Sequence, residues 1–278
     1  MSDGLLNWNV EPEIFWITDS FPLKYYSLLF MIGIVVAFQI EKRIFIKENV
    51  PLERLDKLII YVIVGIILGA RLGHCFFYEP EYYFKNPIEI LLPIKKVGDS
   101  YNFIGFQGLA SHGGTIGVLI SLGLYCKKYK TNFLWLMDRI AIVGPIVGAF
   151  IRLGNFMNSE IYGKPTNGNW GVVFQRDDII PRHPTQLYEA FSYLLIFGIL
   201  MYTYQKSFKR RHDGLIFGLC LLLIFSARLI IEYFKENQVG FEAAMFMNMG
   251  QVLSIPFIII GLILVLMGKI SPVYKKNI

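Results

Sequence analysis

The sequence predicts an all-α polytopic membrane protein with seven transmembrane helices and a small periplasmic head between the fourth and fifth spans. Of its 278 residues, 54% are hydrophobic and only 17% are charged, which is too apolar for a soluble globular domain of this length. Apolar runs of about 20 residues, the length that crosses a bilayer, also recur along the chain. We therefore expect a single integral membrane domain over residues 1–278. The runs lie at 23–40, 58–78, 104–126, 133–151, 187–205, 214–234 and 248–267.

Basic residues follow the first, third, fifth and seventh apolar runs. By the positive-inside rule these connections are cytoplasmic, so we expect an external N-terminus and a cytoplasmic C-terminus. The acidic first twenty residues lack the basic region and small-residue cleavage site of a removable signal peptide. The basic residues are Lys42, Arg43, Lys47, Arg54, Lys57, Lys127, Lys128, Lys130, Lys206, Lys209, Arg210, Arg211, Lys269, Lys275 and Lys276.

The long connections at 79–103 and 152–186 are then external. The second contains GKPTNGNWG and RDDIIPRHP, whose glycine, proline and asparagine content predicts a small head of turns and short strands over 152–186. The net charge of +6 falls in short clusters between apolar runs, which argues against a nucleic-acid partner. Cys75, Cys126 and Cys220 show no metal or redox spacing, so we expect them to be buried as small hydrophobic residues.

Polar side chains from six spans are predicted at one depth, in the outer half of the membrane. Counting ~1.5 Å per helical residue, Arg71 and Arg228 lie ~20 and ~21 Å from the inner ends of their spans, and His112 lies ~12 Å below an outer end, in a hydrocarbon core ~30 Å thick. A charge in a span costs about 2.5–3.5 kcal/mol and is usually retained for function. The outer ends of other spans add Arg152, Tyr26 and the segment RHPTQLYE at 182–189.

Each of these residues also has a structural explanation. Arg152 could reach the lipid headgroups, and Arg228 could be held by Glu232 one helical turn later. His112 could pack where the adjacent glycines of SHGGTIG let two helices approach closely. Glu160 and Glu189 could be solvated carboxylates, and Asn155 could cap a helix. Tyr26, Tyr188 and Trp170 could belong to an aromatic belt at the membrane surface.

Arginines and a histidine at this depth favour an anionic lipid headgroup as ligand. Arginine binds phosphate through a planar fork, and histidine transfers protons near neutral pH. No HExxH, paired-cysteine or Asp-rich motif is present, so neither a metal nor another cofactor is expected. A CDP-alcohol phosphatidyltransferase would need clustered aspartates, whereas the only adjacent pair is Asp177 and Asp178 in the head. The alternatives are a structural membrane protein and an organic-anion transporter with an arginine-lined pathway, although no repeat-symmetric halves are visible.

Four segments in order resemble the prolipoprotein diacylglyceryl transferases. They are SHGGTIG at 111–117, RLGNFMNSEIYG at 152–163, RHPTQLYE at 182–189 and RLIIE at 228–232. The resemblance runs from KYYS at 24–27 through GARLG at 69–73 to the sixth span. It departs at Ile224, where the family often has tyrosine, at Ser27, where it commonly has glycine, and at LAS before the histidine, where MSF is more usual.

The resemblance implies an enzyme of the bacterial cytoplasmic (inner) membrane. It would transfer the diacylglyceryl group of phosphatidylglycerol to the lipobox cysteine of a prolipoprotein signal peptide, forming a thioether and releasing glycerol phosphate. His112 would take the thiol proton, unless the arginines lower the thiol pKa sufficiently by themselves. The implied catalytic residues are His112, Arg152, Arg228, Glu160 and Tyr26. Arg152 and Arg228 would also bind substrate, together with Asn155, Glu232, His183, Gln186 and Glu189, and with Arg71 from its depth.

Overall fold

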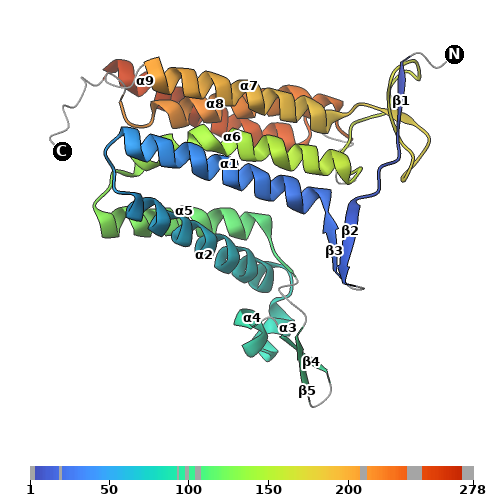
Figure 1. The fold of residues 1–278 in the computed structure, drawn as a ribbon, viewed down its shortest axis with the longest axis horizontal. Coiled ribbons are helices and arrows are strands. Elements are labelled where there is room, and N and C mark those ends of the chain that lie inside the picture. Colours follow the sequence, from blue (N-terminus) through green and yellow to red (C-terminus); the bar gives the residue numbers. More distant parts are fainter. Residues whose placement is uncertain are drawn as a thin grey trace. The chain divides into compact units, whose positions relative to one another are not determined.

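The computed structural model describes residues 4–18, 21–92, 94–97, 100–103, 108–206, 212–236 and 246–270. Each predicted apolar run falls on a long helix, so the predominantly helical fold is confirmed (Figure 1). The start of the predicted 104–126 span and the basic residues Lys209, Arg210, Arg211, Lys275 and Lys276 lie outside the described residues. The long helices are α1 (Tyr25–Lys47), α2 (Leu52–Phe77), α5 (Ser111–Tyr129), α6 (Phe133–Met157), α7 (Thr185–Lys206), α8 (Leu215–Ile231) and α9 (Met249–Ile270).

Among the described residues, five segments are long and apolar enough to cross a membrane. The chain is therefore a multi-pass membrane protein. Helices α1 and α5 are not among the five, and α5 begins with Ser-His-Gly-Gly and ends near Lys127 and Lys128. Seven spans remain a prediction. The five segments are Leu52–Phe77, Phe133–Met157, Thr185–Lys206, Leu215–Phe234 and Met249–Met267.

The chain forms two compact units, one of residues 1–44 and 137–278 and the other of residues 45–136. In the second unit α2 and α5 pack through glycines spaced four residues apart. A Cβ atom on Gly69 would lie 2.7 Å from Gly117 Cα, and one on Gly73 would lie 2.7 Å from Gly113 Cα. Because those distances are too short for a side chain, the glycines allow the two helix backbones to approach closely. Gly113, next to His112, therefore has a packing role.

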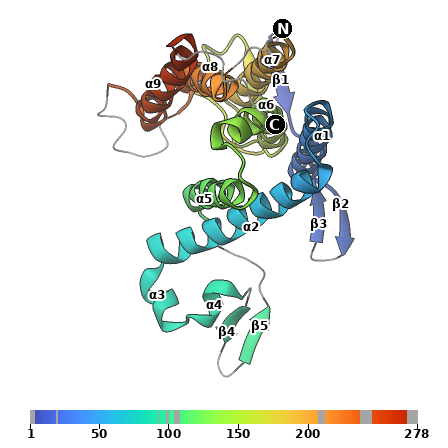
Figure 2. The ribbon, with the colours of Figure 1, turned by 90° about the vertical axis from the view of Figure 1, so that its left-hand side faces the viewer.

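The segment after α2 contains short elements in place of an extended loop. Helices α3 (Pro80–Lys85) and α4 (Ile88–Leu91) are followed by an antiparallel hairpin of β4 (Ile94–Val97) and β5 (Ser100–Phe103), as Figure 2 shows. The Tyr82 hydroxyl donates to Glu89 Oε2 over 2.7 Å. This hydrogen bond to a carboxylate raises the pKa of Tyr82 to about 12.

The core of the first unit lies among α6, α7 and α8, where Ile142, Leu200 and Ile216 are fully buried. Figure 1 shows α7, α8 and α9 running alongside one another. The start of α8 is capped from α6, because the Asp138 carboxylate accepts hydrogen bonds from the backbone N–H groups of Gly214 and Phe217 at 3.0 and 2.8 Å. A carboxylate at a helix N-terminus satisfies free donors and interacts favourably with the helix dipole.

The predicted head contains short strands, but its sheet also includes an N-terminal strand that was not predicted. Strand β1 (Leu5–Trp8) pairs in parallel with β6 (Gly171–Phe174), which pairs antiparallel with β7 (Pro181–Arg182). A separate hairpin joins β2 (Glu13–Thr18) to β3 (Phe21–Lys24), which leads directly into α1. A pairing between segments more than 160 residues apart has no local sequence signal, which explains why β1 was missed.

Candidate functional site

Helix α6 continues beyond its apolar run and carries polar residues in its last two turns. Arg152 and Asn155 lie three residues apart on this helix, and Arg152 Nη1 donates to Asn155 Oδ1 over 3.2 Å. Residues with this spacing lie on the same helical face. The polar segment that appeared to end the fourth span in the sequence is therefore still helical as far as Met157.

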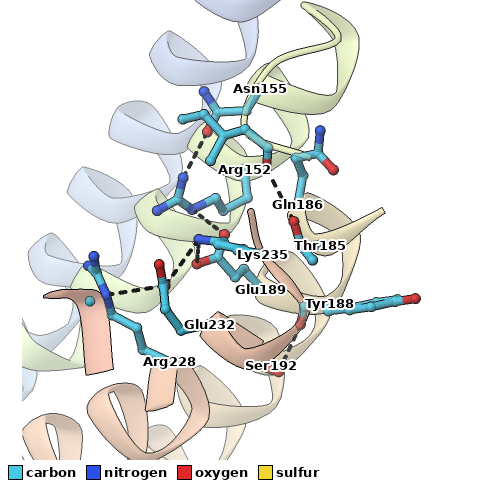
Figure 3. A network of polar contacts seen from close by, with 12 residues as sticks. Arg152, Asn155, Thr185, Gln186, Tyr188, Glu189, Ser192, Arg228, Glu232 and Lys235 are labelled. Carbon is cyan, nitrogen blue, oxygen red and sulfur yellow. Dashed lines mark hydrogen bonds and ion pairs between the residues drawn. The ribbon is translucent and has the colours of Figure 1, made fainter. Parts of the chain in front are cut away.

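Arg152 is one end of a chain of ion pairs that connects α6, α7 and the end of α8 (Figure 3). Arg152 Nε lies 3.0 Å from Glu189 Oε2 on α7, and Lys235 Nζ donates to Glu189 Oε1 over 2.9 Å. Lys235 Nζ also lies 3.6 Å from Glu232 Oε2, and Arg228 Nε lies 3.9 Å from the same oxygen. Glu232 begins the short 3₁₀ helix η1 (Glu232–Phe234) that follows α8. We call these five residues the ion-pair network.

The network is buried at its centre and more accessible at its two arginines. Glu189, Glu232 and Lys235 are each no more than 3% exposed. The side chains of Arg152 and Arg228 are 18% and 36% exposed, respectively. Three cations meet two carboxylates, so one positive charge is not compensated within the network. Burying charge is costly unless it is paired, and a bound phosphate would supply the missing anion to the accessible arginines.

Residues at the start of α9 hold the end of α8 in place next to the network. Asn248 Nδ2 donates to the backbone oxygen of Glu232 over 3.2 Å, and Gln251 Nε2 donates to that of Leu229 over 3.3 Å. A Cβ atom on Gly250 would lie 2.5 Å from Glu232 Cδ, so any side chain at this position would displace the carboxylate. These contacts fix the position of Glu232 and hence of its two cationic partners.

Glu160 lies in a turn just after α6 and is connected to the network through Asn155. Asn155 Nδ2 donates to Glu160 Oε1 over 2.7 Å, and Asn158 Nδ2 donates to the same oxygen over 3.2 Å. From α7, Gln186 Nε2 donates to the backbone oxygen of Glu160 over 2.8 Å. The structure thus brings together Arg152, Asn155, Glu160, Gln186 and Glu189, which are distributed over two predicted motifs.

Tyr26 lies against the same end of α6. It is the second residue of α1, and a Cβ atom on Gly154 would lie 2.7 Å from Tyr26 Cδ2. A larger residue at 154 would therefore displace the Tyr26 ring. Gly154 follows Arg152 by two positions, so Tyr26 packs against the part of α6 that carries Arg152.

His183 belongs to the head. Its Nδ1 atom lies 3.2 Å from the Tyr188 hydroxyl, and its ring packs edge-on against Trp170 with the ring centres 4.8 Å apart. Its backbone N–H donates to the Lys164 oxygen. Burial lowers the pKa of the His183 imidazole below its ordinary value, because the charged form is the one that loses hydration.

A buried arginine stabilises the head beside His183. Arg182 pairs with Asp178 and, at 2.6 Å, with Glu236, and its guanidinium lies 4.9 Å from the centre of the Tyr162 ring. The hydrogen bonds from Arg182 lower the pKa of the Asp178 carboxyl below its ordinary value. Because Glu236 follows Lys235 in the chain, Arg182 links the head to the segment that carries Lys235.

Arg71 and His112 lie in the unit of residues 45–136, whereas the ion-pair network lies in the other unit. Arg71 is 5% exposed, and its guanidinium donates to the backbone oxygens of Glu89 and Ile90 and to the Tyr83 hydroxyl. Within its unit Arg71 therefore holds α3 and α4 against the end of α2. His112 is exposed.

The expected position of His112 well inside a helix is wrong. Helix α5 begins at Ser111, so His112 lies in its first turn, and residues 108–110 are not helical. Gly108 has a φ of +72°, a left-handed conformation that interrupts a helix, and Ala110 is extended at the N-cap position. The apolar run that begins at residue 104 suggested a helix around His112 on both sides, but the described residues before Ser111, 108–110, are not helical.

Sequence reasoning missed Lys235, the residue at the centre of the network. A lysine just after an apolar run is usually taken as a boundary charge. The only available signal was its spacing, since Lys235 follows Glu232 by three residues, a separation that favours an ion pair on a helix. Its second partner, Glu189, is 46 residues away and could not be deduced from spacing.

Comparison with known proteins gives consistent matches over most of the chain. The family model of prolipoprotein diacylglyceryl transferase matches residues 12–267. A phosphatidylglycerol–prolipoprotein diacylglyceryl transferase of Bacteroides fragilis is 48% identical over 258 residues, which are 92% of this chain and 93% of the relative. Enzymes of the same name from Tolumonas auensis and Chloroherpeton thalassium are 46% and 38% identical, over 95% and 93% of this chain and 98% and 92% of theirs. The chain therefore belongs to the prolipoprotein diacylglyceryl transferase family.

Proposed function

We propose that this chain transfers the diacylglyceryl group of phosphatidylglycerol to the lipobox cysteine thiol of prolipoproteins, the first step of bacterial lipoprotein maturation. The ion-pair network supports this proposal most directly, since its unpaired positive charge and two accessible arginines suit a phosphodiester headgroup. The names of the relatives point to the same transferase activity and give no support to an organic-anion transporter.

The proposed chemistry is a substitution at carbon. The cysteine sulfur attacks the glycerol carbon that bears the phosphate ester, the carbon–oxygen bond breaks, and a thioether forms. The departing oxygen takes the bonding electrons, so negative charge accumulates on the released glycerol phosphate. Arg152 and Arg228 stabilise this charge, and electrostatic stabilisation of this kind is usually the largest single contribution to catalysis.

Activation of the thiol is assigned to His112. A free cysteine has a pKa of about 8.5, so only a few per cent is thiolate at neutral pH, and loss of hydration in the membrane reduces that fraction further. The exposed imidazole in the first turn of α5 is available to a substrate. In the competing account, Arg152 and Arg228 lower the thiol pKa without a base.

The other residues are assigned to positioning and binding. Glu189 and Glu232 orient the arginines through the contacts described above, and Asn155 links Arg152 to Glu160. His183 orients the head, and Arg71 holds the α3–α4 segment against the end of α2. Tyr26 and Glu160 complete the set at the outer end of α6, and Gln186 binds the lipid from the start of α7.

We further propose a cytoplasmic-membrane topology with seven spans, an external N-terminus and a cytoplasmic C-terminus. The head at 152–186 is then external, the site lies in the outer half of the bilayer, and both amphiphilic substrates enter laterally. Reporter fusions at residues 49 and 129 should report cytoplasm, and fusions at 90 and 170 should report the exterior. A reversed result at any two positions would contradict this topology.

The proposed activity is tested with purified protein, phosphatidylglycerol vesicles and a peptide that contains a lipobox cysteine. Mass analysis should find the peptide heavier by one diacylglyceryl group, together with free glycerol phosphate. A peptide with serine in place of cysteine is the matched control and should remain unmodified. Flux of an organic anion into protein-containing liposomes without peptide modification would favour a transporter instead.

A further inference from the structure

Three buried polar atoms beside Glu160 have no hydrogen-bond partner. They are Asn158 Oδ1, Ser159 Oγ and Gln186 Oε1. Gln186 itself is fully buried, and its side chain and that of Asn158 both donate to Glu160, through Nε2 to the backbone oxygen and through Nδ2 to Oε1, respectively. Asn158 and Ser159 lie in the turn directly after α6, and Gln186 in the first turn of α7 is hydrogen-bonded to that turn. Each of the three atoms lacks the partner that buried polar groups nearly always have.

The hydrogen bonds to Glu160 also determine which way the two amides point. Gln186 Nε2 is the atom 2.8 Å from a carbonyl oxygen, and Asn158 Nδ2 is the atom 3.2 Å from a carboxylate oxygen. Only N–H groups can donate to those acceptors. The free atoms of both amides are therefore acceptors, and Ser159 adds a hydroxyl that can donate or accept.

The turn that presents these atoms has a costly conformation. Ser159 and Ile161 have φ angles of 57° and 58°, in the left-handed region that residues other than glycine rarely adopt. Each such residue costs about 1–3 kcal/mol, and an unsatisfied buried polar group costs a similar amount. Strained backbone of this kind clusters at ligand-binding sites, and a bound group with hydroxyls would satisfy the unpaired polar atoms.

The free atoms are connected to the arginine that is assigned to the phosphate. Asn155 contacts Arg152 on one side and Glu160 on the other, at 3.2 and 2.7 Å. Glu160 is exposed, whereas the centre of the network is buried. A lipid whose phosphate contacts Arg152 would thus extend its polar headgroup towards the Glu160 turn.

We propose that Asn158, Ser159 and Gln186 form a subsite that binds the hydroxyl groups of a polyol headgroup. This inference rests on the proposed function and adds the part of the lipid that each atom recognises. Two acceptors with an adjacent hydroxyl match a vicinal diol, whose two O–H groups donate to the amide oxygens. Glycerol esterified to phosphate carries such a diol, so the subsite selects the leaving group of the reaction.

The test compares two lipids with the same phosphodiester charge and the same acyl chains. Phosphatidylglycerol carries the diol, and phosphatidylpropanol has a headgroup of the same carbon number without hydroxyls. We expect the wild-type kcat/KM to favour phosphatidylglycerol by at least ~10-fold, because a site built to bind a hydroxyl rejects an analogue that lacks it. In Gln186→Met this preference should fall to less than about a third of the wild-type ratio.

Two further variants keep the result interpretable. Ser159→Gly removes the hydroxyl and relieves the left-handed strain, so this variant should fold and should also lower the preference. Gln175→Met changes an exposed glutamine in the head and should leave the preference unchanged. A purely structural role for Gln186 and Ser159 would lower the rates on both lipids equally and would leave their ratio as in the wild type.

The outcomes also separate this inference from the proposed activity. Equal wild-type rates on the two lipids would overturn the diol subsite while leaving the transferase activity intact. A wild-type protein that modifies the peptide with neither lipid would overturn the proposed function itself. Unchanged lipid preference in both Gln186→Met and Ser159→Gly would assign selection of the headgroup to other residues and would also overturn the inference.

Discussion

Replacing Lys235 with methionine should destabilise the protein more than any single surface change. Methionine has a similar length without the charge, so the change leaves Glu189 and Glu232 with only their arginine contacts. Lys235 Nζ makes the shortest hydrogen bond in the network, at 2.9 Å, and lies in a position that is 3% exposed. Removing one partner of a buried ion pair typically costs about 3–5 kcal/mol.

The charge change also predicts a loss of activity. Without Lys235 the network has two cations and two carboxylates, so the excess positive charge that suits a phosphate disappears. We expect transfer to fall at least ~10-fold, while Lys235→Arg, which restores the charge, should recover a large part of it. The matched control is Lys57→Met, which changes an exposed lysine and should alter neither stability nor turnover.

The assay measures two quantities on the same detergent-solubilised preparations: the free energy of unfolding and the rate of peptide modification. A double variant, Lys235→Met with Glu189→Gln, removes a carboxylate together with its cation and should be more stable than the sum of the single changes by about 0.5–3 kcal/mol. If Lys235→Met unfolds within about 0.5 kcal/mol of the wild type and shows no coupling to Glu189→Gln, the assignment of Lys235 as the central cation is wrong.

Three other changes probe the arginines, the histidine and the head. Arg228→Lys should insert and fold yet transfer little lipid, because a lysine cannot form bidentate hydrogen bonds to phosphate; near-normal turnover in the peptide assay would limit Arg228 to a simple charge. His112→Gln should lose at least ~10²-fold in rate and recover partly as pH rises towards the thiol pKa, and a wild-type rate at neutral pH would assign thiol activation to the arginines. Asp178→Asn should destabilise the head, because Arg182 lowers the pKa of the Asp178 carboxyl. The stability that this carboxylate contributes is fully present above the ordinary aspartate pKa of about 3.9. It is lost as the pH falls through the lowered value. Melting at pH 7 should therefore separate wild type from variant, and the difference should shrink in acid.

The sequence predicted the helices well because each is a local property. An apolar run long enough to cross a membrane can be recognised without knowing its partner helix, and each predicted run overlaps a long helix. The ends of helices also depend on local residues. Asn49, with a φ of 57°, lies just after α1, and Asn132 Oδ1 accepts a hydrogen bond from the Trp135 N–H at the start of α6. Helix boundaries were less certain, and the start of α5 was misplaced because composition does not reveal the left-handed Gly108.

The sequence indicates which of these residues contact one another only where they lie close together in the chain. Arg152, Asn155 and Glu160 occupy nine consecutive positions, so their convergence follows from one helix and the turn after it. Lys235 and Glu189 meet only because α7 and the end of α8 pack together. Arg71 was grouped with the other arginines by depth alone, and its guanidinium donates to backbone oxygens of α4 and to the Tyr83 hydroxyl of α3.

The polar stretch RLGNFMNSE poses the central physical question of this chain, because polarity directly after an apolar run normally marks the end of a span. In the structure the helix continues to Met157, and its polar side chains Arg152 and Asn155 each have a partner beyond their own helical turn. Arg152 contacts Glu189 on α7, and Asn155 contacts Glu160 after the helix ends. A solvated loop would need none of these contacts, and an arginine extending to the headgroups would not need a buried carboxylate. The continuation of α6 therefore places charge at a fixed position beside α7, which is what a site for a lipid phosphate requires.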